Sequence, residues 1–323
     1  MGRFSTFGNS LYTGEKSIDF VGRRKIWYSI AAVVLLLSVL LPALRGGFHF
    51  GIEFQGGSEF RVSQAADQGS TLAIDTIASV DPELNPIVTT VGTGDLRIQT
   101  ELLSDDASET VRSALAKAYG VESADVSSSF IGASWGDEIT GKAIAGLLWF
   151  MALAAVLMAL YFRTVKMSVA AMAALAHDLI ATAGIYGALG FEVTPAAVIG
   201  FLTILGYSLY DTVVVFDKIR ENTEEVEFSE TATFKERVNL AINQTLVRSI
   251  NTTIVAVLPV AAILFIGAFF LGAGTLKDIS LALFIGMIVG TYSTIFIAAP
   301  LYSQLREGEA KFSKAATKVV AAR

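Results

Sequence analysis

The sequence predicts a polytopic α-helical membrane protein with six transmembrane helices and one small α+β domain outside the membrane, between the first two helices. Mean hydropathy is +0.57 and charged residues make up 17% of the chain, against about 25% in soluble globular proteins. Six apolar runs are long enough to cross a hydrocarbon core, which takes about 20 helical residues. The block 46–141 interrupts these runs and carries 15 of the 30 acidic residues, which indicates a solvated domain.

The apolar runs define the expected order along the chain. A head, 1–25, precedes the first transmembrane helix, 26–45; the other five helices lie within 142–302, and a tail, 303–323, follows. We place the spans near Ile26–Leu44, Ala143–Phe162, Met167–Leu189, Pro195–Phe216, Ile250–Leu271 and Ile279–Leu301.

Basic residues predict the orientation. Seventeen of the 24 Lys and Arg residues lie in the head, in the turn after the second span, in the segment 217–248 or in the tail. Loops on the cytoplasmic side are enriched in Lys and Arg. We therefore expect both termini in the cytoplasm and the block 46–141 on the other side of the membrane.

The block 46–141 alternates between strand-like and helix-like patterns. Gly92-Thr93-Gly94 suits a tight turn between its two middle strands. The resulting βαββαβ order predicts a ferredoxin-like α+β sandwich. The expected elements are strand Ser58–Ser63, helix Thr71–Val80, strands Ile87–Val91 and Asp95–Thr100, helix Ala107–Tyr119 and strand Asp125–Ile131.

The segment 217–247, between the fourth and fifth spans, is predicted to be cytoplasmic. Its less polar side chains recur near helical spacing, at Phe234, Val238, Ala241, Ile242 and Thr245. This pattern fits an amphipathic helix on the inner membrane face and equally a solvated connector helix.

Two glycine patterns predict local backbone features. The pairs Gly46-Gly47 and Gly56-Gly57 suit a flexible, strand-like entry into the outside domain. Gly286 and Gly290 in the sixth span form a small-xxx-small match, which allows two helices to approach closely.

The fourth span contains a carboxylate, Asp211, within an apolar run. Such a group costs roughly 2.5–3.5 kcal/mol near the centre of a bilayer, so intramembrane carboxylates are functional candidates by default. Thr203 and Tyr207 are spaced at intervals of four residues with Asp211 and are expected to share its face. The alternative is a carboxylate that only ties neighbouring helices together.

Arg248 lies at the start of the fifth apolar run and can reach a depth similar to that of Asp211. Thr245 and Thr252 are expected on the same face as Arg248. An ion pair between Asp211 and Arg248 would lower the cost of both charges. The alternative is an arginine that extends to the interface and anchors the helix there.

The third span contains His177 and Asp178 near the middle of the membrane. Asp178, Thr182 and Tyr186 form a second polar stripe, and a histidine can relay protons near neutral pH. A buried hydrogen-bonded contact between helices fits the same residues. Adjacent helical residues point about 100° apart, which does not favour a catalytic dyad. With two histidines and no cysteine, we expect no metal site.

Several stretches together resemble the SecD/SecF family of the bacterial protein-export machinery, within the RND superfamily, and specifically its SecF type. The longest and most specific of these is Gly206–Asn222. Glu53 stands where the family has Asp, and Tyr210 where Asn is common, which changes the surroundings of Asp211. The other matching stretches are Gly51–Gly57, Ala176–Asp178, Glu192–Pro195, Gln244–Ser249 and Gly290–Phe296.

The resemblance implies an accessory subunit, not an enzyme, in the bacterial inner (plasma) membrane. Six spans would form one half of an RND-type assembly, with SecD as the other half. Expected partners are SecD, the SecYEG channel with SecA in the same pathway, unfolded preproteins and the lipid bilayer, with no nucleic acid.

The resemblance also implies that protons are the coupling ion, with no cofactor, and that Asp211 and Arg248 form the proton pathway. Polar residues expected to support this pathway are His177, Asp178, Thr203, Tyr207, Tyr210, Thr212 and Thr252.

Other function classes stay open at this point. A half-size RND-type exporter of small molecules or lipids would share the spans, although the outside domain is small and single. An intramembrane enzyme built on His177 and Asp178 lacks a convincing nucleophile, since there is no Gly-x-Ser-x-Gly motif and no cysteine. A structural assembly subunit would need no titrating Asp211.

Overall fold

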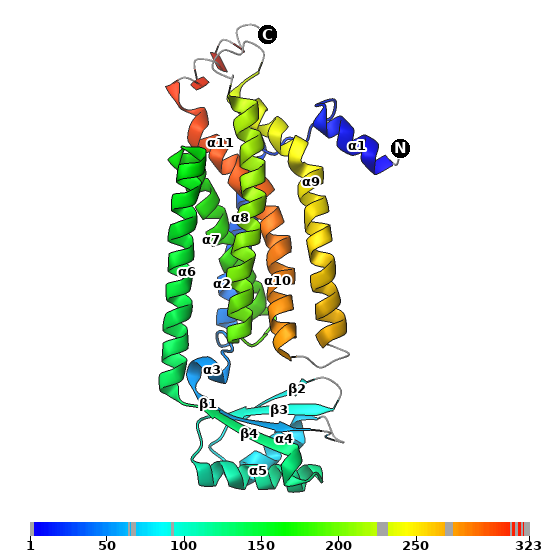
Figure 1. The fold of residues 1–323 in the computed structure, drawn as a ribbon, viewed down its shortest axis with the longest axis vertical. Helices are drawn as coiled ribbons and strands as arrows, with labels where there is room; N and C mark the ends of the chain where they lie inside the picture. The colour runs from blue at the N-terminus through cyan, green and yellow to red at the C-terminus, as the bar shows by residue number, and fades with distance from the viewer. Residues whose placement is uncertain are drawn as a thin grey trace.

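The computed structural model describes residues 3–63, 65, 69–91, 94–224, 232–268, 274–310, 312–313, 316–317 and 319. A bundle of long helices has the α+β domain at one end (Figure 1). Helices α1 (Arg3–Tyr12) and α11 (Ala299–Glu307) lie at the opposite end. We call this opposite end, which includes the turn between α6 and α7, the basic end of the bundle.

Six helical segments of the described chain are long and apolar enough to cross a membrane. The predicted six-span membrane protein is therefore confirmed. The last of these segments continues from α10 through a π-helical turn, Thr294–Ala298, into α11. The spanning helices are α2 (Arg24–Leu44), α6 (Ala133–Phe162), α7 (Val165–Ala188), α8 (Pro195–Thr223), α9 (Phe234–Ala262, with a π-helical turn Ile263–Ala268) and α10 (Gly274–Ser293).

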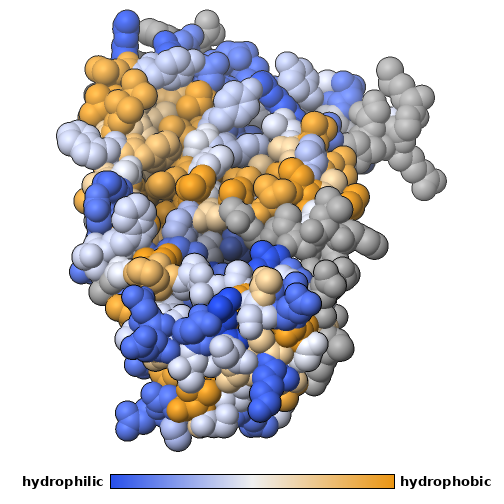
Figure 2. Space-filling model, turned by 60° about the horizontal axis from the view of Figure 1, so that its bottom comes forward, coloured by the Kyte–Doolittle hydropathy of each residue, from blue (hydrophilic) through white to orange (hydrophobic). Residues whose placement is uncertain are grey.

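The helices form an inner and an outer group. Helices α7, α8 and α10 pack against one another and are well buried, whereas α2, α6 and α9 expose much of their apolar surface. Figure 2 shows this surface as an apolar belt between the hydrophilic α+β domain and a second hydrophilic zone at the basic end. Exposed members of the belt include Leu36, Val39, Leu148, Trp149, Val255 and Leu258.

Small residues bring α8 and α10 close together, as the glycine spacing predicts. A Cβ added at Gly286 would lie 2.5 Å from Ile204 Cγ1, and one at Gly290 would lie 3.0 Å from Ser208 Cβ. A side chain at Gly286 would force its neighbours to move, and one at Gly290 would be tightly packed. The backbones can therefore approach closely, which is how small residues drive helix association in membranes.

The α+β domain has the predicted ferredoxin-like topology. The chain order is β1–α4–β2–β3–α5–β4, and the four antiparallel strands are ordered β2-β3-β1-β4 across the sheet. Strands β2 and β3 have the predicted bounds, while Gly92 and Thr93 of the expected turn lie outside the described residues. The elements are β1 (Gly57–Val62), α4 (Ser70–Val80), β2 (Ile87–Val91), β3 (Asp95–Thr100), α5 (Asp105–Tyr119) and β4 (Val126–Ile131).

The two faces of this sheet have different surroundings because side chains alternate along a strand. Phe60 in β1 and Ile98 in β3 are fully buried, in a core shared with α4 and α5. Glu59 pairs with Gln99 across the two strands on the opposite face. That polar face meets the bundle through contacts described below.

Two segments differ from the sequence-based expectation. The entry to the α+β domain contains a single helical turn, α3 (Ile52–Gln55), bounded by Gly56 at φ 78°. Within 217–247, α8 continues to Thr223, and the later helical part is continuous with the fifth span, since α9 begins at Phe234 behind a Thr233–Glu236 capping box. The apolar side of the first part of α9 packs against α11 and the head. A helix whose apolar stripe is covered by other parts of the chain has the same sequence pattern as one that lies on a membrane.

Candidate functional site

Helix α8 holds Asp211 well inside the bundle. The helix starts at a defined cap: Thr194 Oγ1 accepts a hydrogen bond from Ala197 N at 3.2 Å, and Pro195 occupies the first turn, where its missing N–H is not needed. Asp211 follows Pro195 by about 24 Å at the rise of an α-helix. About 18 Å of helix then remains before Thr223.

Asp211 is buried between α8 and α9. The residue is 6% exposed, and its Oδ1 accepts a hydrogen bond of 2.8 Å from Ser249 Oγ. Its Oδ2 is buried and has no hydrogen-bond partner among the described residues. A carboxylate can accept several hydrogen bonds, so this group has capacity left for a proton or another donor.

A second carboxylate, Asp178, is fully buried one helix away. Ser208 Oγ donates to Asp178 Oδ2 at 2.5 Å, and His177 Nδ1 lies 3.3 Å from Asp178 Oδ1. Gly290 on α10 provides the space beside Ser208. Because Ser208 and Asp211 lie one turn apart on α8, the two carboxylates are linked to successive turns of one helix.

Hydroxyl groups extend these contacts to α9 and α10. Tyr207 Oη donates to Thr253 Oγ1 at 3.3 Å, Thr253 Oγ1 lies 2.5 Å from Thr291 Oγ1, and Thr212 Oγ1 lies 3.0 Å from Thr294 Oγ1. Four helices thus share one polar region within an otherwise apolar bundle. We call it the intramembrane polar cluster; it comprises His177, Asp178, Tyr207, Ser208, Asp211, Thr212, Ser249, Thr253, Thr291 and Thr294.

Four of the predicted site residues form no hydrogen bond or ion pair with this cluster in the part of the chain that the structure describes. Arg248 is exposed and forms no ion pair with Asp211. Thr252 is half-buried, Thr203 is exposed and donates to Ile199 O of its own helix, and Tyr210 is 56% exposed.

Helix geometry explains these displacements. The inward stripe of α9 contains Thr245, Ser249 and Thr253, so Arg248 and Thr252 point about 100° away from it. Residues four apart also drift by about 40° per step, which moves Thr203 off the face of Asp211. The missed residues Ser208, Ser249, Thr253, Thr291 and Thr294 carry a weak signal, because Ser and Thr are common in membrane helices. The spacing of four between Ser249 and Thr253 is the one pattern that could have revealed them.

A second polar network joins the α+β domain to the bundle around Arg97 of β3. Arg97 Nε donates to Glu59 Oε2 at 2.6 Å, and Arg97 Nη1 donates to Glu192 Oε2 at 2.8 Å. Glu192 lies in the loop between α7 and α8, and its Oε1 accepts from Gln99 Nε2 at 2.8 Å. Glu53 of α3 completes the group, with its Oε1 at 3.6 Å from Arg97 Nη2. We call these five residues the Arg97 network.

Charge and burial shift one carboxyl group of this network. Burial raises the pKa of Glu53, and the nearby carboxylates of Glu192 and Glu59 raise it further. Arg97 and a backbone hydrogen bond offset part of this effect. Glu53 Oε2 is buried without a hydrogen-bond partner among the described residues, which is consistent with a carboxyl group that holds its proton more tightly than usual.

Backbone contacts reinforce the same junction. Val193 N donates to His49 O at 2.7 Å, and Gly51 N donates to Val193 O at 3.0 Å. The next residue, Thr194, caps α8 and also donates from Oγ1 to Asp278 Oδ2 of α10 at 2.9 Å. The entry to the α+β domain, the start of α8 and the start of α10 are therefore held together.

The chemistry available in the polar cluster is proton exchange. Buried carboxyl groups and hydroxyls can bind and pass protons, because each hydroxyl both donates and accepts. In the described ranges, no group of three or more His, Asp or Glu side chains is placed to hold a metal ion.

A family model described as "Protein export membrane protein SecD/SecF, C-terminal" matches residues 110–308. The chain belongs to the SecD/SecF family. Members are protein-export membrane proteins, and the six spans make this chain a multi-pass member.

Curated relatives in the SecD/SecF family carry the SecF name. The protein translocase subunit SecF of Streptomyces coelicolor is 45% identical over 323 residues, which is 100% of this chain and 86% of that protein. The SecF subunit of Mycobacterium leprae is 43% identical over 95% of this chain and 68% of its own length.

Solved SecDF structures share the fold. The crystal structure of SecDF from Thermus thermophilus matches 90% of this chain at 30% identity with a TM-score of 0.76. A super-membrane-facing form of SecDF matches 94% at 29% identity with a TM-score of 0.64. This chain spans 39% and 40% of those two chains.

The range matched by the SecD/SecF family model includes all of the intramembrane polar cluster but only part of the Arg97 network. The matched range contains the intramembrane polar cluster and Glu192, whereas Glu53, Glu59, Arg97 and Gln99 precede it. The Streptomyces SecF relative nevertheless aligns with the full chain. Family membership therefore applies to the α+β domain as well as to the bundle.

Proposed function

We propose that this chain works with a SecD partner to promote the passage of unfolded preproteins through SecYEG, with SecA in the same pathway, and draws on the proton gradient at Asp211. Its location would be the bacterial inner membrane, with both termini and the basic end in the cytoplasm. The observation that carries the proposal is Asp211 itself, a buried carboxyl group with one oxygen bonded to Ser249 and the other without a partner among the described residues.

The proton gradient supplies enough free energy to change such a site. One elementary charge that crosses 100 mV releases about 2.3 kcal/mol. That is comparable to the roughly 2.5–3.5 kcal/mol cost of a carboxylate in a bilayer. Protonation of Asp211 would remove this cost, and loss of the proton would restore it.

Arg248 has a role in a second state of this site. When Asp211 loses its proton, an ion pair with Arg248 lowers the cost of both charges. Arg248 is exposed beside α8 in the present state, so a rotation of α9 or the approach of a partner would bring it inward. Tyr210, which precedes Asp211, is 56% exposed on the surface of α8. We assign this surface to the SecD half.

The route from Asp211 to the outside domain runs along α8. Asp211 and the cap residue Thr194 lie on one rigid helix, and Thr194 follows Val193 and Glu192, which contact the entry and the sheet of the α+β domain. A shift of α8 would therefore displace the Arg97 network. The outside domain would move and hold or release an emerging chain.

The test replaces Asp211 by Asn in cells that depend on this chain for export. We expect Asp211→Asn to remove the part of precursor processing that depends on the proton gradient, because the amide cannot carry the proton. Pulse-labelled precursors measure the rate, with and without an agent that collapses the gradient. Co-purification with the SecD partner should be unchanged.

The matched control is Asp217→Asn, which removes an exposed carboxylate from the same helix. Export at the normal rate in Asp211→Asn cells would refute the proton role. Loss of the SecD partner in that variant would instead favour a structural assembly subunit.

A further inference from the structure

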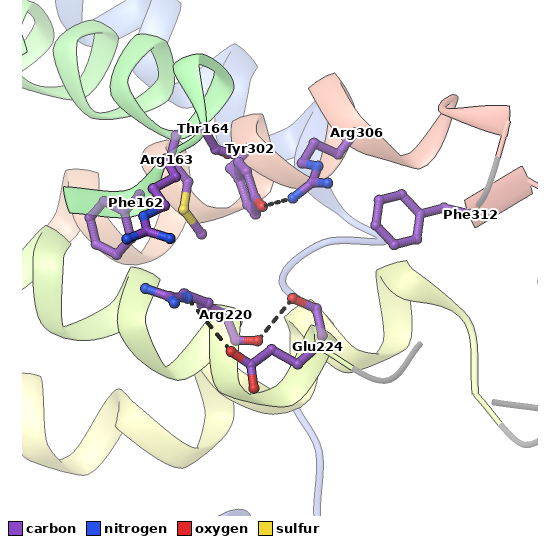
Figure 3. Close-up of a pocket in the computed structure, with 10 residues that line it drawn as sticks. Phe162, Arg163, Thr164, Arg220, Glu224, Tyr302, Arg306 and Phe312 are labelled. Carbon is purple, nitrogen blue, oxygen red and sulfur yellow. Dashed lines mark hydrogen bonds and ion pairs between the residues drawn. The ribbon is translucent and has the colours of Figure 1, made fainter. Parts of the chain in front are cut away.

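A cavity at the basic end of the bundle is separate from the intramembrane polar cluster and the Arg97 network. It has a volume of about 260 Å³ and lies where α6 ends, α7 begins, α8 ends and α11 passes (Figure 3). Its walls are mixed, since Phe162 and Met167 are apolar and three arginines are charged. Because α6, α7 and α8 are long and apolar enough to span a membrane, their ends put the cavity at the level expected for the membrane surface.

Positive charge dominates the lining. Arg163, Arg220 and Arg306 come from three different parts of the chain, and Glu224 is the one acidic residue among the lining residues. Figure 3 shows Arg163 and Arg220 extending toward the same side of the cavity. Like charges gathered in this way repel one another unless an anion lies between them.

The three arginines have different freedom. Arg306 is fixed and its charge is paired: its Nε donates to Glu309 Oε1 at 3.2 Å, its Nη1 donates to Tyr302 Oη at 2.6 Å, and its guanidinium lies 4.9 Å from the centre of the Phe312 ring. Arg220 contacts Glu224 only at 3.7 Å, and both side chains are largely exposed. Arg163 forms no ion pair within the described part of the chain. Two guanidinium groups are therefore available to a ligand.

The backbone at Arg163 gives an independent indication. Arg163 ends α6 in the left-handed region, at φ 52°, and is the only non-glycine residue with positive φ in the described ranges. Glycine is the usual residue at this position of a helix terminus. A non-glycine residue in this conformation carries strain, which accumulates at functional sites. Arginine therefore occupies a position at which the backbone conformation favours glycine.

We propose that this cavity binds a phosphate group, held between Arg163 and Arg220. Planar guanidinium groups bind phosphate oxygens through paired hydrogen bonds. The apolar wall of Phe162 and Met167 suits the glycerol and upper acyl region of a phospholipid. The position at the membrane surface and the mixed walls fit the head group of an anionic phospholipid. Free inorganic phosphate shares the same chemistry, and the experiment separates the two sources.

The experiment measures ligand-dependent thermal stabilisation of the full chain, purified with its partner in a neutral detergent. The probes are phosphatidylglycerol, phosphatidylcholine and inorganic phosphate. We expect phosphatidylglycerol to raise the melting temperature by a few degrees and phosphatidylcholine to have little effect. Arg163→Gln with Arg220→Gln should weaken the apparent affinity for phosphatidylglycerol by at least about tenfold.

Two further variants keep the result interpretable. Arg23→Gln removes an exposed arginine at the same end of the chain and should leave the stabilisation unchanged. Arg163→Gly relieves the left-handed strain, so it should fold at least as stably as the parent and still lose affinity. Stabilisation by inorganic phosphate that depends on the same arginines would assign the site to a soluble anion. Equal stabilisation of the parent, the double variant and Arg163→Gly would overturn the proposal, as would no stabilisation of the parent by either anion.

Discussion

Asp211 takes its hydrogen bond from a serine and not from an arginine, which determines how it can respond to a proton. A guanidinium group only donates hydrogen bonds and therefore favours the carboxylate. The hydroxyl of Ser249 donates to a carboxylate and accepts from a carboxylic acid. The 2.8 Å contact between Ser249 and Asp211 can therefore persist while Asp211 gains or loses its proton. Arg248, the residue before Ser249, is exposed. It therefore remains available to pair with Asp211 when Asp211 is ionised, which distinguishes the two states.

Ser249→Ala tests whether this hydrogen bond supports the site. We expect the variant to be destabilised by about 1 kcal/mol, because a buried carboxylate loses its remaining partner among the described residues. Export should slow but not stop, since Asp211 can still bind a proton. Thermal unfolding in detergent and precursor processing in cells provide the two measurements. Thr203→Val is the control, since the exposed Thr203 hydroxyl bonds only to its own helix. An effect of Ser249→Ala no larger than that of this control would contradict the assignment.

The sequence located the two carboxylates but not their serine partners. Asp211 and Asp178 could be found because a charge in an apolar run is rare and costly. Ser208 and Ser249 could not, because serine is common in membrane helices and its role depends on which helix lies opposite. A shift of one residue along α9 turns the face by about 100°. The predicted Arg248 stripe and the observed Ser249 stripe differ by that single step.

At the scale of elements, the contact between α8 and α10 positions the polar cluster. Gly286 and Gly290 face Ile204 and Ser208, so the close approach occurs at the level of the buried carboxylates. The π-helical turn at Thr294–Ala298 follows directly, and Thr294 bonds to Thr212 of α8. Such turns occur often at functional sites.

Two glycine-to-alanine variants separate packing from helix propensity. Gly286→Ala should destabilise the bundle by about 1–3 kcal/mol, because the new methyl group overlaps Ile204 and the helices must separate. Gly206→Ala should be neutral or stabilising by up to about 1 kcal/mol, since its Cβ meets nothing within 4 Å and alanine favours the helix. Thermal unfolding of the two purified proteins measures the difference. Equal melting temperatures would show that the α8–α10 contact is looser than described.

Residue periodicity predicts the position of most helices and strands. It does not show where one helix ends when an amphipathic pattern runs directly into an apolar span. Strands β2 and β3 have the predicted bounds because alternating residues and turn signals flank them. The pattern in Phe234–Thr245 predicts an amphipathic or connector helix ahead of the fifth span, and α9 runs continuously through both. Its apolar stripe is real, but the surface that covers it comes from α11 and the head. A sequence pattern shows that a face is buried and does not show what buries it.

At the scale of the whole molecule, the Arg97 network makes the membrane bundle and the outside domain one mechanical unit. The network joins β1, β3, α3 and the loop before α8, and backbone bonds between Val193, His49 and Gly51 lie beside it. One arginine faces three carboxylates there. The junction therefore carries excess negative charge at neutral pH, and its strength should depend on the pH outside the membrane.

Glu53 determines the sign of this dependence. Burial and the neighbouring Glu192 and Glu59 raise its pKa in the folded protein above the usual 4.5. Its contribution to stability is therefore fully present below the pKa of the unfolded chain and is lost as pH rises through the folded pKa. The junction should be tighter on the acidic side of a proton gradient and looser when that side becomes neutral.

Glu53→Gln removes this titration and mimics the protonated group. Hydrogen exchange of the peptides that contain Gly51 and Val193 reports on the junction, and comparison with the parent at each pH cancels the intrinsic dependence of exchange. We expect the variant to be more protected than the parent at pH 8. The difference should shrink as pH falls and vanish near pH 4, where Glu53 of the parent is itself protonated. Glu83→Gln, an exposed change in the same domain, should match the parent throughout. A variant that is less protected than the parent at pH 8 would mean that the ionised Glu53, through Arg97, is the form that holds the two domains together.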